Sequence, residues 1–208
     1  MKRAGVVILL GLCVLPAHGE QVNLSTNELH AMTPIGSVPT KQDILDIFPT
    51  NTVQQLTALA EDRCGSQIPM PCDVGVRLRA IRALPEFCLP SCDNTPAHQT
   101  LVTLVDNLVI IPPNQQTGIT LLLLRASIEA LGIAKSGDTD DVTRIARALD
   151  NPSRDVRAAA AYALRDLCLQ SAVPRLRDRY SIEMGMTGVP QVRLAISAAL
   201  RDLNTCSN

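Results

Sequence analysis

The sequence is poor in aromatic side chains and nearly neutral, and both shortages exclude a class of function. It contains no tryptophan, two phenylalanines and two tyrosines among 208 residues. Its 19 basic side chains are balanced by 20 acidic ones. Proteins that bind nucleic acids combine a basic surface with aromatic side chains on which bases stack. The composition therefore predicts no nucleic-acid partner.

Histidines and closely spaced cysteine pairs are also scarce. His30 and His98 are the two histidines beyond the first 19 residues, and no two cysteines have the Cys-x-x-Cys spacing of structural zinc sites. A nucleophilic serine or cysteine needs a histidine within reach. No nucleophile elbow, phosphate loop or dinucleotide fingerprint occurs. The sequence thus indicates no catalytic residue, no cofactor and no metal site. It favours a protein that is not an enzyme and leaves the point open.

The first 19 residues have the pattern of a secretory signal peptide. Residues 1–3 include the basic pair Lys2 and Arg3, residues 4–16 are mainly apolar, and residues 17–19 include small side chains before a cleavage site. The apolar run is shorter than the roughly 20 residues of a membrane-spanning helix. A lipoprotein signal would need a small residue before Cys13, and Leu12 stands there. We expect export to a periplasm or to the outside of the cell, with no integral membrane segment after cleavage.

Removing this segment takes away Lys2 and Arg3, which leaves a formal net charge of −3. Residues 20–41 are polar and contain Pro34, Gly36 and Pro39, so they are expected to form an extended lead-in. Residues 42–206 are expected to form one helical domain.

Six cysteines remain after the signal, and an even number in an exported chain predicts three disulfides formed in an oxidising compartment. Six cysteines allow 15 pairings. Two pairs are close in sequence, and the third joins equivalent ends of adjacent repeats. Cys168 with Cys206 would staple the C-terminal end, and Cys64 with Cys72 and Cys88 with Cys92 are reasonable local pairs, but the sequence leaves the connectivity open.

An alanine-rich helical stripe that ends in Ala-Leu occurs four times. The pairs are Ala83-Leu84, Ala130-Leu131, Ala163-Leu164 and Ala199-Leu200. In all but the second, a Val-Arg pair stands eight and seven residues before the leucine. Successive pairs are 47, 33 and 36 residues apart, near the length of two-helix repeat units. The recurrence predicts stacked helical hairpins, and the small side chains allow their close approach.

Capping residues predict where individual helices begin and end. Asp73, Thr95 and Ser153 are placed to cap helix N-termini, and Gly132 or Gly137 is placed to end a helix. The acidic run 137–141 lacks the loop pattern of a calcium site. We interpret Asp138 or Thr139 in that run as a helix cap.

Residues 150–164, with the sequence DNPSRDVRAAAAYAL, resemble the HEAT repeat, in the short bacterial form also found in phycobilisome-lyase-like proteins. Residues 189–200 and 73–84 are similar to the same pattern, while the unit ending at Leu131 has Leu-Leu in place of Val-Arg. The resemblance covers roughly residues 50 to 204. It implies an all-α fold, an α-solenoid of about four stacked HEAT-like hairpins.

Arg77, Arg157 and Arg193 occupy one position of the repeat and have two interpretations. Exposed on a concave groove without acidic partners, they would form an anion-binding ladder. Paired with turn carbonyls or with acids such as Asp73 and Asp155, as is common in HEAT repeats, they would hold the repeats together; we favour this second interpretation. Two further pairs are expected to form contacts between repeats: Arg165-Asp166 and Arg201-Asp202.

The resemblance and the signal together predict an exported HEAT-repeat scaffold that mediates protein–protein interaction, with a protein partner that the sequence does not identify. One alternative is a ligand-handling or lyase-like protein that uses an arginine-lined concave surface. The other is a structural accessory of an envelope assembly. Lyase chemistry of related repeats takes place in the cytoplasm of pigmented cells, so the export signal disfavours it.

Overall fold

A computed structural model describes residues 25, 32, 40–64, 72–89, 92–187 and 190–206. The predicted signal peptide lies outside these residues, as does most of the predicted lead-in. Within the lead-in, Met32 is fully buried in the core and Lys41 begins the first described α-helix. The part of the chain that the structure describes is helical and contains no strand, so the all-α prediction is confirmed.

Among the described residues, the structure has the following α-helices and three short 3₁₀ segments. Their bounds are α2 Lys41–Ile47, α3 Thr52–Ala60, α4 Val74–Ala83, α5 Pro96–Val109, α6 Gly118–Ile133, α7 Thr139–Arg147, α8 Arg154–Leu167, α9 Ala172–Met184 and α10 Gln191–Leu203. The 3₁₀ segments are η1 Leu84–Phe87, η2 Pro113–Gln115 and η3 Ala148–Asp150. No described helix is both long and apolar enough to cross a lipid bilayer.

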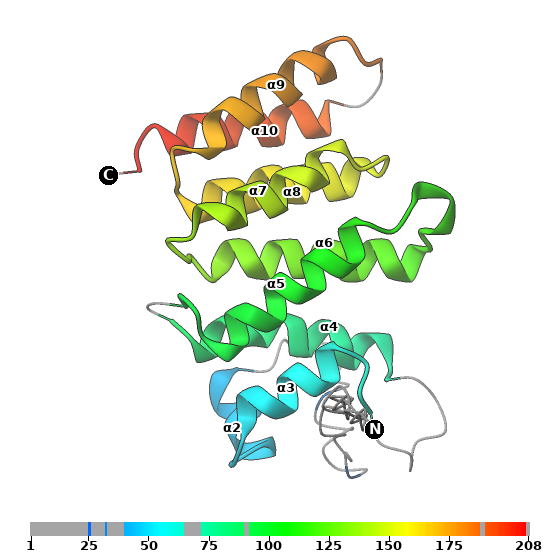
Figure 1. The fold of residues 1–208 in the computed structure, drawn as a ribbon, viewed down its shortest axis with the longest axis vertical. Helices are drawn as coiled ribbons and strands as arrows, with labels where there is room; N and C mark the ends of the chain where they lie inside the picture. Colours follow the sequence, from blue (N-terminus) through cyan, green and yellow to red (C-terminus); the bar gives the residue numbers. More distant parts are fainter. Residues whose placement is uncertain are drawn as a thin grey trace, which may run out of the picture.

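Helix α3 packs against α4, α5 against α6, α7 against α8 and α9 against α10, and these pairs stack in two layers (Figure 1). We call α3, α5, α7 and α9 the front layer and α4, α6, α8 and α10 the back layer, as they lie in Figure 1. The helix α8 packs extensively on both α6 and α10. Contacts of α5 with α7 and of α7 with α9 are fewer. The back layer is therefore the more closely packed of the two.

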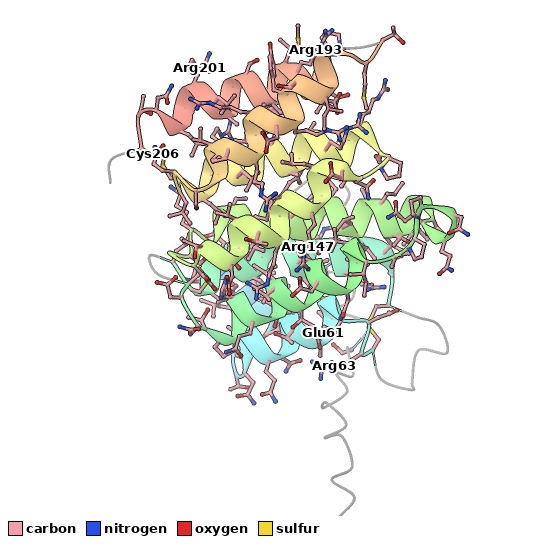
Figure 2. The ribbon with its side chains drawn as sticks, turned by 45° about the horizontal axis from the view of Figure 1, so that its top comes forward. Glu61, Arg63, Arg147, Arg193, Arg201 and Cys206 are labelled. Atoms are coloured by element: carbon pink, nitrogen blue, oxygen red, sulfur yellow. A yellow bond between two sulfur atoms is a disulfide. The ribbon has the colours of Figure 1, made fainter. Side chains whose placement is uncertain are left out.

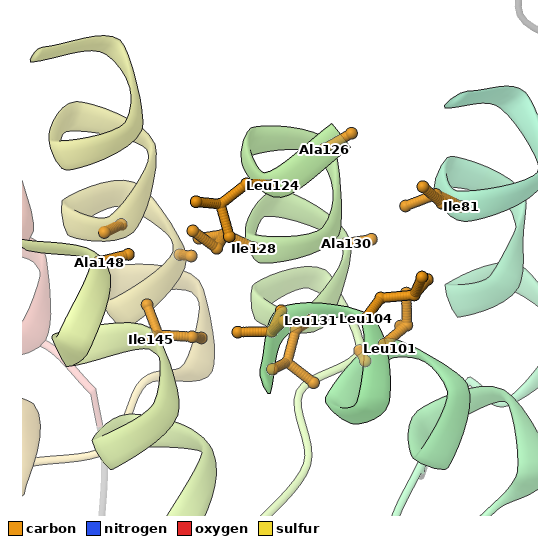
Figure 3. Packing of buried hydrophobic residues seen from close by; sticks show 14 of the residues in the cluster. Ile81, Leu101, Leu104, Leu124, Ala126, Ile128, Ala130, Leu131, Ile145 and Ala148 are labelled. Atoms are coloured by element: carbon orange, nitrogen blue, oxygen red, sulfur yellow. The ribbon is translucent and has the colours of Figure 1, made fainter. Parts of the chain in front are cut away.

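Small side chains explain the close packing of the back layer. A Cβ atom added at Gly132 on α6 would lie only 2.7 Å from the Cα atom of Ala163 on α8. Toward α4, Ala126 and Ala130 of α6 face Ile81 (Figure 3). Helix α6 does end next to Gly132, as predicted, but the absence of a side chain there also permits the approach of α8.

Three of the four predicted capping sites behave as expected. Asp73 accepts hydrogen bonds from the backbone of α4, Thr95 accepts one from the N–H of His98, and Asp138 accepts one in the first turn of α7. Ser153 precedes α8 but makes no side-chain cap. Its N–H instead donates to Oδ1 of Asn151, 2.9 Å away, because the asparagine turn orders this segment before the helix begins.

The cysteines form the three pairs that the spacing made reasonable. The Cα–Cα separations are 5.5 Å for Cys64–Cys72, 4.6 Å for Cys88–Cys92 and 5.6 Å for Cys168–Cys206. Cys168 ends α8 in the left-handed region, with φ of 60°. Nearby, Nε2 of Gln170 donates to the carbonyl of Leu203 at 2.6 Å. The third disulfide therefore ties the ends of α8 and α10 together.

Candidate functional site

Arg157, the middle arginine of the predicted ladder, is buried and forms hydrogen bonds within the protein. It is only 9% exposed. Its Nη1 donates to the carbonyls of Asn151 and Pro152, both at 2.9 Å, and its Nε donates to Oε1 of Glu183 on α9 at 2.7 Å. One guanidinium thus binds the turn of its own repeat and an acid of the next repeat.

Glu183 also accepts hydrogen bonds from Nε and Nη2 of Arg179, at 2.9 and 2.6 Å. Burial of Glu183 raises its pKa, but hydrogen bonds from Arg179 and Arg157 outweigh burial and hold the pKa below the ordinary value of 4.5. A carboxylate held by two guanidinium groups is an expected way to keep a buried charge compensated. The group is a structural link between α8 and α9.

Arg77 makes a similar but more exposed set of contacts. Its Nη2 donates to the carbonyl of Ala60 at 3.3 Å, and its Nη1 donates to Oδ2 of Asp62 at 3.1 Å. Both acceptors lie at the end of α3 or just after it, within the same helix pair. The predicted partner Asp73 instead caps α4. Arg77 therefore links α4 to the end of α3, and its acidic partner Asp62 is one that the sequence did not indicate.

Arg193 differs from the other two arginines. It is half-buried on α10, and no described residue forms a hydrogen bond or ion pair with it. Figure 2 shows it at the upper end of the molecule, on the same helix as Arg201. The predicted ladder does not form one anion site, because two of its members are engaged by protein groups and the third lies at the end of the array.

The two Arg-Asp pairs after the Ala-Leu motifs were interpreted wrongly. Arg165 donates to the adjacent Asp166 at 2.8 Å, and Arg201 donates to the adjacent Asp202 at 3.0 Å. Both pairs lie within one helix and are partly or largely exposed. They are local surface pairs rather than contacts between repeats, since the last turn of each helix points these side chains toward solvent.

A buried polar cluster joins the front helices α5 and α7. Nε2 of His98 lies 2.6 Å from Oδ2 of Asp141, and the hydroxyl of Ser136 donates to the same oxygen. Arg144 donates to the other oxygen, Oδ1, at 3.2 Å. The His98, Asp141 and Ser136 side chains are nearly or fully buried. This cluster is the main group of residues that sequence reasoning missed.

The order of contacts in this cluster excludes a nucleophilic triad. A triad needs histidine between serine and carboxylate, so that the imidazole can remove the serine proton. Here Asp141 lies between Ser136 and His98, and Ser136 donates its proton to a carboxylate that only accepts. The Ser136 hydroxyl bonds to Asp141 and not to the imidazole of His98. The cluster is therefore a hydrogen-bonded link between two helices.

The two ionisable groups of the link shift each other's pKa. The hydrogen bond to Asp141 raises the pKa of His98 above 6.5, although burial opposes this. Burial alone would raise the pKa of Asp141, but hydrogen bonds from His98 and Ser136 lower it below 3.8. Both directions favour the charged form of each group, so that protonated His98 and ionised Asp141 form an ion pair.

An open groove of about 800 Å³ lies between α3 and α5 at one end of the front layer. Its lining has many hydroxyl and amide groups around a few apolar side chains: Asn51, Thr52, Val53, Gln54, Thr57, Glu61, Phe87, Pro96, Gln99, Thr100 and Thr103. Across its floor, the hydroxyls of Thr57 and Thr100 are 2.8 Å apart. Glu61 is the one ionisable side chain in this lining, and it pairs with Arg63 at 2.7 Å. Figure 2 shows Glu61 and Arg63 side by side at this end.

Helix geometry explains why the groove opens here. Thr100 and Thr103 are on α5, one turn apart, so both side chains point toward α3. Thr100 is buried at the floor, whereas Gln99 and Thr103 are exposed at the edge. On the other side, Nζ of Lys41 lies 5.3 Å from the centre of the Phe87 ring. The groove therefore has a polar edge and an apolar end.

A second, smaller hollow of about 380 Å³ lies between α7 and α9. Its lining includes Arg147, Arg175 and Arg179 but also Asp150 and Asp178. Nη1 of Arg179 donates to Oδ1 of Asp150 at 3.1 Å. Because opposite charges alternate here, the hollow has no single-signed field for an anion. Within the described ranges, no three histidine, cysteine or acidic side chains gather closely enough to hold a metal ion.

Comparisons of this chain with family models, with curated proteins and with solved structures found no match.

The groove could not be located from the sequence because its residues come from separate segments. Positions 51–61, Phe87 and 96–103 meet only when α3 packs beside α5. The signal that could have suggested it is the group of hydroxyl and amide residues Gln99, Thr100 and Thr103 on α5.

Proposed function

We propose that the protein is an exported α-solenoid of four HEAT-like hairpins, and that it is a non-enzymatic scaffold that binds a segment of a protein partner in the α3–α5 groove. The observation that supports this most directly is the groove itself, about 800 Å³ and open to solvent. Hydroxyl and amide side chains at its edge match the N–H and C=O groups of an extended peptide. Phe87 and Pro96 offer apolar surface to one of its side chains.

Export is supported by the pattern of residues 1–19 and by the three disulfides, because disulfides form and persist in oxidising compartments. The hairpin repeat is supported by the pairing of successive helices and by the two layers. An arginine-based ligand function has less support, because Arg77 and Arg157 already donate to protein acceptors.

The test is photocrosslinking of the full-length protein in its native host. A photoreactive phenylalanine derivative replaces Gln99 at the groove edge in one variant and the exposed Ile119 on α6 in a matched control. We expect crosslinks to a second protein from position 99 and few from position 119. The additional change Thr103→Trp, which fills the groove, should remove them. Equal labelling from both positions, or labelling that Thr103→Trp leaves unchanged, would contradict the proposal.

A further inference from the structure

Helix α10 exposes a face whose equivalent is covered on α8, the neighbouring helix of the back layer. On α8, Ala158, Ala161 and Leu164 are buried, and α10 packs along this helix. Arg157 at the edge of this face receives the carboxylate of Glu183 from α9. The pair α9–α10 thus covers α8 with one helix and binds its arginine with the other.

A shift of 36 residues superimposes this pattern on α10. Arg157, Ala158, Ala161 and Leu164 correspond to Arg193, Leu194, Ser197 and Leu200. Leu194 is 63% exposed, Ser197 is exposed, and Leu200 and Arg193 are half-buried. No described helix follows to cover them. We call these four residues the α10 face.

We propose that the α10 face binds a helical hairpin of a different protein, in the way that α9–α10 binds α8, with a carboxylate of that hairpin paired to Arg193. This surface is separate from the α3–α5 groove. Arg157 supplies the internal precedent, because the same repeat position binds Glu183 at 2.7 Å. Arg193 has the same side chain in the same position and no described partner.

The residues of the α10 face are more typical of a surface that binds another helix than of the solvent-exposed end of a helical array. The last repeat of a helical array usually presents a polar outer surface to solvent. Here an exposed leucine occupies the position where α8 has a buried alanine. Ser197 and Ala198 are small, so a second helix can approach to the usual separation of about 8–10 Å. Leu194 would then pack between the two helices of the partner.

Charge disfavours a second copy of this chain as the occupant. Two α10 faces brought together would gather Arg193 and Arg201 of both copies at one interface. Asp202, the nearest acidic residue in α10, is already bound to Arg201 at 3.0 Å. Like charges placed across an interface suppress a pairing, whereas an acidic partner relieves them. The occupant is therefore an acid-bearing helical segment of another protein.

The test places a photoreactive phenylalanine derivative at position 194 of the full-length protein in its native host and maps the crosslinked peptide by mass spectrometry. We expect a segment of another protein with helical apolar spacing and a nearby aspartate or glutamate. Arg193→Glu should lower the crosslink yield about tenfold, because it replaces an attractive charge pair by a repulsive one. Arg82→Glu, the same charge change on the exposed side of α4, is the matched control and should leave the yield unchanged.

A second experiment distinguishes loss of the charge pair from misfolding of the Arg193→Glu protein. Once the acidic residue of the partner is mapped, its replacement by lysine should restore crosslinking to the Arg193→Glu protein. Helical circular dichroism should be the same for both arginine variants. Crosslinks to this chain itself, no crosslink at all, or a yield that Arg193→Glu does not change would overturn the proposal. The groove is tested at position 99 and the α10 face at position 194, so failure of one is distinguishable from failure of the other.

Discussion

The two layers of helices in the molecule pack in different ways. In the back layer, α6, α8 and α10 are in close contact through alanine and glycine, as at Gly132 and Ala163. In the front layer, α5, α7 and α9 are joined by polar side chains such as Asp106 and Arg144, with hollows between them. Close packing fixes the spacing of the repeats in the back layer. The wider spacing of the front layer leaves room for a partner.

The largest loss of stability is expected when one methyl group is added to the closely packed back layer. In Gly132→Ala, the new Cβ would meet the backbone of α8 at 2.7 Å, so the two helices must separate. We expect a loss of about 2–3 kcal/mol in the free energy of unfolding, although alanine favours helix by about 1 kcal/mol over glycine.

The matched control is Gly118→Ala at the start of α6, where nothing lies within 4 Å of an added Cβ. This change should be neutral or slightly stabilising. Urea denaturation followed by circular dichroism measures both variants. Equal stability of the two proteins would show that the layers are not packed as described.

The second largest effect is expected at the ion pair between Arg157 on α8 and Glu183 on α9. Arg157→Met keeps most of the apolar contact but removes one of the two arginines that hold Glu183, which should cost about 2 kcal/mol of stability. Arg193→Met, at the equivalent position of the last repeat, removes no described contact and should change stability by less than about 0.5 kcal/mol. Thermal unfolding of both variants measures the difference, and similar losses would argue against the distinction between them.

The hydrogen-bonded link between α5 and α7, formed by His98 and Asp141, should contribute less to the free energy of unfolding, and its contribution should depend on pH. Because the pKa of folded His98 is raised, its contribution to stability is complete below pH 6.5 and is lost as the pH rises through the raised value. Because the pKa of Asp141 is lowered, its contribution is complete above pH 3.8 and is lost as the pH falls through the lowered value. The His98–Asp141 pair therefore stabilises the fold most between pH 3.8 and pH 6.5.

Unfolding in urea across pH 4 to 9 tests this expectation. The wild-type protein should lose stability above pH 6.5, and His98→Gln, which cannot titrate, should lose much less over the same range. A decline of equal slope in both proteins would assign the pH dependence to other groups.

The smallest effect is expected for the exposed ion pairs of the front layer. Asp106 accepts from Arg144 at 3.2 Å and from Arg147 at 3.3 Å, and all three side chains are partly exposed. Exposed pairs of this kind contribute about 0–1 kcal/mol. Asp106→Asn should therefore lower stability by less than about 1 kcal/mol, and the loss should shrink in 1 M salt. A loss as large as that of Gly132→Ala would mean that the front layer is as tightly coupled as the back layer.

The sequence was informative about the back layer and much less so about the front layer. Alanine and leucine at helical spacing predicted α8 and α10 well, because a buried stripe follows directly from the period of the helix. The even number of cysteines predicted three disulfides, and the pairs that form are the local or repeat-equivalent ones that the spacing made reasonable.

The front-layer contacts depend on packing between helices that are distant in sequence. His98 and Asp141 are 43 residues apart, and nothing in the local pattern of either indicates the other. The acidic run 137–141 suggested a cap, which Asp138 provides, but Asp141 in the same run is fully buried. The acceptors of Arg77 and Arg157, Asp62 and Glu183, were missed because their positions relative to the arginines depend on the turns.

The most direct measurement of the difference between the layers is hydrogen–deuterium exchange of the full-length protein, resolved by peptide. Backbone amides in closely packed helices exchange only through large-scale unfolding, whereas those in loosely packed helices exchange through local opening. We predict the slowest exchange in α6, α8 and α10 and clearly faster exchange in α7 and α9. Exchange in α7 and α9 that is as slow as in α8 and α10 would contradict the account.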